Sequence, residues 1–161
     1  MLPPTTYPSA TTTTLTCDDS GAASTPPGTD DLSANGLTFS ETSGVVSRPA
    51  FELTENSAAH PFQKVFLYVS LDAAPQTRLT ITDPPDAYLY YVPESTWQSR
   101  QTDAQVLSSL TKSVTVSRCE SDFTGYFGGI VLGSGPCVTL RVDPLPAGTS
   151  TTLTVQLPGP C

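Results

Sequence analysis

Histidine, the side chain that most often moves protons in enzymes, occurs once in this sequence, at His60. A serine–histidine–aspartate triad would have to be built around it. No Gly-x-Ser-x-Gly elbow surrounds any serine, so His60 is expected in an exposed loop. Carboxylates are present without the signature of a glycosidase pair, at Glu41, Glu52, Glu55 and Glu94. The sequence therefore predicts no catalytic residue and no enzymatic activity.

A glycine-rich stretch and two acidic pairs are the other candidate binding motifs. Residues 125–135 include five glycines but no following Lys-Ser/Thr, so the stretch is not a phosphate loop. Bulges, turns or close strand packing are the expected use of these glycines. Asp18-Asp19 and Asp30-Asp31 carry oxygen ligands that suit calcium, yet they lack EF-hand spacing. They are interpreted as solvated turn residues, and neither a metal nor a cofactor is predicted.

Four cysteines carry the most specific chemistry of the chain: Cys17, Cys119, Cys137 and Cys161. Their number is even and no Cys-x-x-Cys or Cys/His pair has zinc spacing, so two disulfides and an oxidising compartment are predicted. Four cysteines allow three pairings, and the sequence alone does not choose among them. The favoured pairing joins Cys119 to Cys137 across a strand–loop–strand unit and Cys17 to Cys161 across the chain ends.

Composition narrows the class of protein and its partners. The 161 residues include 16 Pro and 11 Gly, and only 14% are charged. This balance favours β-strands joined by turns. The net charge is −8, and the few basic residues are scattered along the chain. Without a cluster of basic residues, neither nucleic acid nor an anionic membrane surface is expected as a partner. No apolar run is long enough to span a membrane. The first residues lack a basic start and an apolar core, so an exported form is expected to have lost its leader.

The chain divides by composition into an N-terminal segment and a domain. Residues 1–34 are rich in Thr, Pro and Asp and poor in bulky apolar side chains, which predicts an extended segment ending in a linker. Residues 35–161 contain short stretches in which apolar and polar residues alternate, as in antiparallel strands buried on one face. Pro- and Gly-containing turns separate these stretches. The prediction is a β-sandwich domain over 35–161, with one short helix beginning at Thr102 or Asp103 and ending at Leu110.

The alternation also predicts the inward-facing residues of the sandwich. They are Val65, Leu67, Val69, Leu71, Leu79, Ile81, Val138, Leu140, Leu153 and Val155. The intervening threonines, such as Thr80 and Thr154, are expected to face solvent.

Two stretches resemble a known family. In Leu79–Val92 a strand ends at Asp83-Pro84-Pro85-Asp86 and a Tyr-rich strand follows; in Pro136–Val155 the turn Leu145-Pro146-Ala147-Gly148 joins two Thr/Val strands. Both are similar to passages in Ig-like repeat domains of bacterial cell-surface proteins, a repeat of unknown function. The resemblance implies an antiparallel Ig-like β-sandwich that serves in stalks, adhesins or surface assemblies, without catalytic residues.

Two functions remain as expectations. The first is a non-catalytic structural or interaction module, secreted or on the cell surface, which self-associates into an oligomer or a pilus-like filament. Its N-terminal strand would enter a neighbouring copy, with Tyr7 and Leu15 filling pockets there. The alternative is a carbohydrate-binding module that binds polysaccharide. Tyr90, Trp97 and Tyr126 are expected to form a platform for a sugar or for a protein partner.

Overall fold

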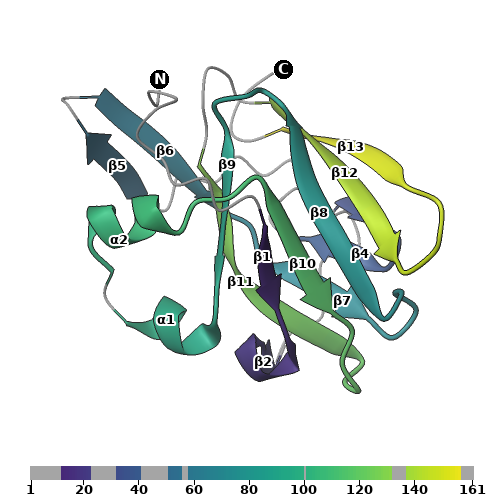
Figure 1. The fold of residues 1–161 in the computed structure, drawn as a ribbon. Coiled ribbons are helices and arrows are strands. Elements are labelled where there is room, and N and C mark those ends of the chain that lie inside the picture. The colour runs from purple at the N-terminus through teal and green to yellow at the C-terminus, as the bar shows by residue number, and fades with distance from the viewer. Residues whose placement is uncertain are drawn as a thin grey trace.

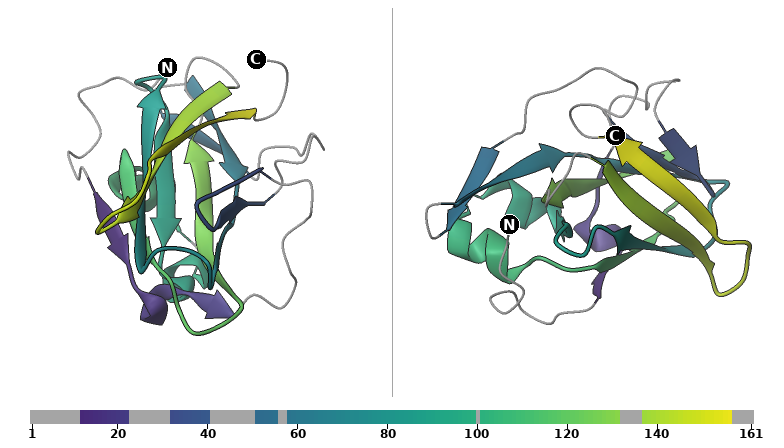
Figure 2. Two further views of the ribbon diagram at one scale, coloured as in Figure 1. Left: turned by 90° about the vertical axis from the view of Figure 1, so that its right-hand side faces the viewer. Right: turned by 90° about the horizontal axis from the view of Figure 1, so that it is seen from above.

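The computed structural model describes residues 12–22, 32–40, 51–55, 58–99, 101–131 and 137–156. Short strands dominate this part of the chain, as the Thr- and Val-rich alternation predicts. They form two sheets (Figure 1). The described part of the protein is therefore all-β in architecture, with the two sheets layered in the manner of a β-sandwich (Figure 2).

The first sheet has five strands in the order β1-β10-β8-β12-β13. Their bounds are β1 Thr13–Leu15, β10 Ser113–Ser117, β8 Gln76–Asp83, β12 Cys137–Leu145 and β13 Thr151–Gln156. All neighbours are antiparallel except β1, which runs parallel to β10. The ends of this order, β1 and β13, are the two edges of the sheet.

The second sheet has eight strands, with β11 at its centre. Along its path lie β3 Leu32–Ala34, β4 Leu37–Phe39, β7 Leu67–Ser70, β11 Phe123–Val131, β6 Ala58–Lys64 and β5 Phe51–Glu55; β2 Gly21–Ala22 and β9 Tyr88–Val92 also pair with β11. β11 is long enough to pair with β7 and β2 near its start and with β6 and β9 near its end. It therefore holds most of this sheet together.

Two short helices lie beside β9 and β11, on the opposite side of the molecule from the β12–β13 hairpin (Figure 1). The predicted helix is present as α2 Asp103–Ser108. Thr102 caps it, because its hydroxyl accepts from the Gln105 N–H at 3.2 Å and its own N–H donates to Gln105 Oε1 at 2.9 Å. α1 Glu94–Gln98 was not predicted, since its five residues give too little periodicity to recognise.

The main core lies between the two sheets and contains nearly all of the predicted inward-facing residues. Leu67, Leu79 and Leu140 are fully buried there, and Leu153 packs against the same cluster. Leu71 is the exception, with 47% of its surface exposed. Strand β7 ends at Ser70, so Leu71 falls in a turn where the alternation of the strand no longer decides which way a side chain faces.

The described parts of the expected N-terminal extension are paired into the sheets. Thr13–Leu15 pairs with β10, Gly21–Ala22 with β11, and Leu32–Ala34 with β4. The boundary expected between residues 34 and 35 consequently falls inside the β3–β4 hairpin. Its turn is Asn35-Gly36, and both residues have positive φ, 53° and 82°, as a type I′ turn requires.

Candidate interaction surface

The N-terminal edge strand β1 is held in its own domain by three kinds of contact. Its three residues pair with Val114, Thr115 and Val116 of β10. Leu15 is 2% exposed and belongs to the main core. Immediately after the strand, Cys17 is bonded to Cys119, with their Cα atoms 5.9 Å apart. The strand is therefore part of the fold of its own chain.

The turn that follows β1 is stabilised by the sequence Thr16-Cys17-Asp18-Asp19. These residues form a single turn of 3₁₀ helix, η1 Cys17–Asp19. The carboxylate of Asp19 accepts from the backbone N–H and from the hydroxyl of Thr16, at 2.8 and 3.2 Å. Asp19 thus acts as a capping side chain, which fits its interpretation as a turn residue rather than a metal ligand. Asp30-Asp31, the other acidic pair considered as a source of calcium ligands, lies outside the described residues.

The disulfide pairing corrects the favoured sequence prediction. Cys17 is bonded to Cys119, 102 residues away, so the expected Cys119–Cys137 and Cys17–Cys161 bonds are wrong. Cys137 is disulfide-bonded as well, and its partner lies outside the described residues. No described cysteine is free, as the even count predicts. The error is physical in origin: a parallel β1–β10 pair brings Cys17 next to the residues after β10, and nothing local in the sequence reveals that pairing.

The expected role of Leu15 in a neighbouring copy is also corrected. Because Leu15 is buried in the core of its own domain, it is not available to fill a pocket elsewhere. Tyr7, the other proposed pocket residue, lies outside the described residues. A strand donated by the N-terminal segment would have to come from the residues that precede β1.

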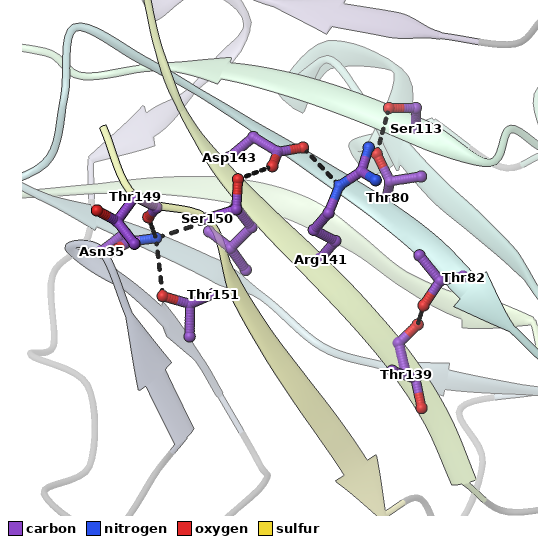
Figure 3. Close-up of polar contacts among 11 residues, drawn as sticks. Asn35, Thr80, Thr82, Ser113, Thr139, Arg141, Asp143, Thr149, Ser150 and Thr151 are labelled. Carbon is purple, nitrogen blue, oxygen red and sulfur yellow. Dashed lines mark hydrogen bonds and ion pairs between the residues drawn. The ribbon is translucent and has the colours of Figure 1, made fainter. Parts of the chain in front are cut away.

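The opposite edge of the sheet is β13, the second strand of the β12–β13 hairpin. Asn35 joins this hairpin to the β3–β4 turn (Figure 3). Its side-chain Nδ2 lies 3.2 Å from Val142 O, from Thr149 O and from Thr151 Oγ1, so one amide contacts both strands and their connection. The left-handed conformation of Asn35 is what aims this amide at the hairpin. The start of β13 is thereby fixed in position.

A polar layer covers the outer face of the same sheet. Thr82 of β8 donates to Thr139 O at 3.3 Å, and the hydroxyls of Thr80 and Ser113 are 2.9 Å apart (Figure 3). On β12, Arg141 lies 3.0 Å from the Asp143 carboxylate. Two side-chain pairs on this face, Thr80 with Ser113 and Arg141 with Asp143, are thus bonded to each other rather than left free.

Asp143 is the anchor of that layer on β12. Its carboxylate accepts a hydrogen bond from Ser150, in the loop between β12 and β13, and another from Arg141. The hydrogen bond from Ser150 is the main reason that the pKa of Asp143 lies below its ordinary value; desolvation opposes this, and Arg141 lowers the pKa further. The charged carboxylate thus holds the β12–β13 loop against its own strand.

Two of the three rings expected to form a sugar-binding platform, those of Tyr90 and Tyr126, are buried. Tyr126 is fully buried, and its hydroxyl donates to Ser117 O at 2.7 Å. Desolvation raises the pKa of Tyr126 to about 12, against the effect of that hydrogen bond. Tyr90 is 3% exposed. Neither ring can present a face to a sugar, so this part of the prediction is wrong.

Tyr90 and Trp97 instead belong to a second, smaller core. It lies under α1 and α2 and contains Phe62, Tyr90, Val92, Val106, Leu110 and Val131, with Trp97 packed against it. The Tyr90 and Trp97 rings are 6.4 Å apart, and Trp97 stacks on Phe127 at the same separation. This second core could not be predicted from the sequence, because alternation predicts one buried face per strand. The helices bury the second face of β9.

The glycines of β11 allow close packing on both sides of this strand, as predicted. A Cβ on Gly128 would lie 2.0 Å from Tyr90 O, and a Cβ on Gly129 would lie 2.1 Å from Gln63 O. Both obstacles are backbone atoms of the flanking strands β9 and β6. The glycines therefore serve the sheet rather than a phosphate.

Gly128→Ala is expected to lower the free energy of unfolding by about 1–3 kcal/mol, because β9 must move away from β11 to admit the methyl group. Urea unfolding followed by tryptophan fluorescence measures the change, since Trp97 lies beside Phe127 of the same strand. Thr154→Ala, at an exposed position of β13, is the control. A Gly128→Ala protein as stable as the wild type would show that β9 and β11 are not in this close contact.

His60 is the histidine considered for catalysis. His60 lies in β6, opposite Leu53 of β5, and not in the loop expected for it. Within the described ranges, His, Cys, Asp and Glu do not gather in any group of three or more that would suit a metal ion. The helices described, α1 and α2 among them, are too short or too polar to cross a membrane.

Comparison with protein-family models, with curated proteins and with solved structures finds no match for this chain.

Proposed function

We propose that this chain is a non-catalytic structural module of an extracellular or cell-surface assembly, in which copies join through their N-terminal residues. The observation that carries the proposal is the position of β1. It forms an edge of the five-stranded sheet and is fastened by the Cys17–Cys119 bond directly after it. The N-terminal residues are therefore joined to the domain at a sheet edge, at a point fixed by the disulfide.

The composition of the preceding residues suits strand donation. Residues 5–12, Thr-Thr-Tyr-Pro-Ser-Ala-Thr-Thr, carry no charge and are rich in β-branched side chains. They have too few apolar side chains to form a core of their own. An extended segment of this kind gains a row of main-chain hydrogen bonds when it pairs with a free strand of another molecule. Because donor and acceptor are different surfaces, such contacts are head-to-tail and build filaments when the rotation does not close.

The disulfides support an extracytoplasmic location. Bonds of this kind persist in secreted and surface proteins and are rare in the reducing cytosol. The resemblance to Ig-like repeat domains agrees with this location, since such domains occur in stalks and adhesins.

Deletion of residues 1–11 tests the proposal. We expect the full chain to form oligomers or filaments as its concentration rises, and the deletion variant to stay monomeric, by light scattering and electron microscopy. The variant retains β1 and Leu15, so its urea midpoint is expected to be unchanged.

A length-matched control replaces residues 5–11 by Gly and Ser, which keeps the tail but removes its preference for extended structure. This control is expected to behave like the deletion. A full chain that is monomeric at all concentrations, or a deletion variant that still assembles, would contradict the proposal. A monomer that is retained on an insoluble polysaccharide would instead favour the carbohydrate-binding alternative.

A further inference from the structure

The two strand orders end in four strands of unequal length and charge, while β2 and β9 lie off these orders and pair with β11. β1 and β3 have three residues each, β5 has five and β13 has six. β5 carries Glu52 and Glu55, and charges at a sheet edge discourage a further strand from pairing there. β13 reads Thr-Thr-Leu-Thr-Val-Gln, without a charge or a proline. It is thus the longest of these four strands, and its sequence has no charge or proline to discourage strand addition.

In the described part of the chain, β13 is hydrogen-bonded to a strand on one side only. Among the described strands, only β12 forms a ladder with it, from Val142–Thr151 to Cys137–Gln156. In an antiparallel ladder alternate residues direct their N–H and C=O groups away from the neighbour, so half of the β13 backbone points outward at the edge. Val155 is buried and Leu153 packs on the core, while Thr152 and Thr154 are exposed. The core and the Asn35 contacts hold β13 in an extended conformation. A strand that adds to its edge therefore does not have to change the backbone of β13.

From this edge we infer that β13 is the acceptor: residues 5–12 of a second copy add to it as an antiparallel strand. The inference rests on the function proposed above and names the surface to which the N-terminal residues bind.

Chain length favours a second copy over the same chain. β1 and β13 are separated by β10, β8 and β12, which makes four strand spacings, or about 19 Å. At about 3.3 Å per residue, a tail folding back across the sheet would use about six residues to reach β13. Crossing the sheet would thus use about six of residues 5–12 and leave about two of them to pair with β13. A second copy can be placed so that its tail leaves β1 beside β13, and all of residues 5–12 are then available.

The strand directions set the orientation of the added segment. β1 runs parallel to β10, and each of the steps from β10 to β8, β12 and β13 reverses direction, so β1 is antiparallel to β13. Thr13 is level with Thr151 through the pairs Thr13–Val114, Val114–Leu79, Leu79–Val142 and Val142–Thr151. We place the second copy so that it continues the sheet, with its β1 in line with the edge of β13. Its residues 12 to 8 then run antiparallel to β13, alongside residues 152 to 156.

This register gives residues 8–12 of the donor a partner on β13. Counting outward from Thr13 and Thr151, Ala10 of the second copy lies beside Thr154, and Pro8 lies beside Gln156. Gln156 is the last residue of β13, so the missing N–H of Pro8 falls where the ladder ends. In this register, residues 5–7 of the second copy would extend past Gln156.

Hydrogen exchange of the full chain tests the inference. Exchange is compared between a concentration at which the protein is monomeric and one at which it is assembled. We expect the outward N–H groups of β13 to exchange about tenfold more slowly, or slower still, in the assembly, while β5 exchanges at an unchanged rate. An assembly in which β13 is not protected would overturn the inference and leave the proposed function standing. A chain that does not assemble would overturn both.

Crosslinking fixes the contact to a residue pair. Full chains carrying Ala10→Cys are mixed with full chains carrying Thr154→Cys, so that only a contact between copies can join the new thiols. We expect a covalent dimer of the two variants on a non-reducing gel. Thr82→Cys is the matched control, because Thr82 is an exposed threonine of the same sheet but lies on the central strand β8. Equal crosslinking to Thr82→Cys, or none to Thr154→Cys, would contradict β13 as the acceptor.

Discussion

Replacing both Cys17 and Cys119 by serine is expected to lower the free energy of unfolding by about 2–5 kcal/mol. The bond closes a loop of 102 residues, which is long enough for the upper part of this range in the chain-entropy account of disulfide stabilisation. The loss has a second source in the native state. Without the bond, three residues of parallel pairing and the buried side chain of Leu15 would have to hold β1 alone.

Urea unfolding of the double variant, with the disulfide of Cys137 left intact, measures the change. Leu15→Ala in the wild-type background separates the two sources, since it removes the buried side chain and keeps the bond. If the double variant unfolded at the urea concentration of the wild type, the Cys17–Cys119 bond would not constrain the unfolded chain as we describe.

Leu140→Ala is expected to cost about 2–5 kcal/mol, and Leu67→Ala the same. Both side chains are fully buried between the sheets, one from each sheet. Truncation removes apolar area from the core and leaves a cavity that the closely packed strands can fill only in part. Leu140 pairs with Ile81 on one side and with Leu153 on the other, so neither neighbour can move in without leaving its own ladder.

Thr154→Ala is the control for Leu140→Ala, because Thr154 is exposed on β13 and is expected to cost less than about 0.5 kcal/mol. Thr80→Ala is expected to fall between them, since its hydroxyl is hydrogen-bonded to that of Ser113. Equal losses for Leu140→Ala and Thr154→Ala would mean that the faces of β12 and β13 are reversed.

The strands of the central region could be predicted because each of them buries one face. Alternation in Leu79–Ile81 and Val138–Leu140 points the same residues into the core that the structure buries. The helix at Thr102 was predictable because Gln105 stands at the spacing of a capping pair. In these places a local pattern and the tertiary structure impose the same requirement, and local information is sufficient.

Other features depend on partners distant in sequence. Thr13–Leu15 is too short and too polar to predict its own pairing, and it forms a strand because β10 supplies a ladder. The Cys17–Cys119 bond follows from that pairing and was mispredicted for the same reason. The burial of Tyr90 depends on helices that cover it. The Asn35-Gly36 turn is different, since Asn-Gly between two apolar stretches is a local hairpin signal that could have placed β3 in the domain.

The Cys17–Cys119 bond also determines how the chain would respond to tension. If neighbouring subunits pulled on the N-terminal residues, force would pass from Cys17 to Cys119 through the covalent bond and bypass the residues between them. Those 102 residues correspond to about 350 Å of contour length at about 3.4 Å per residue, none of which could be drawn out while the bond lasts. A subunit joined through its N-terminus would consequently stay short under load, even where its hydrogen bonds gave way.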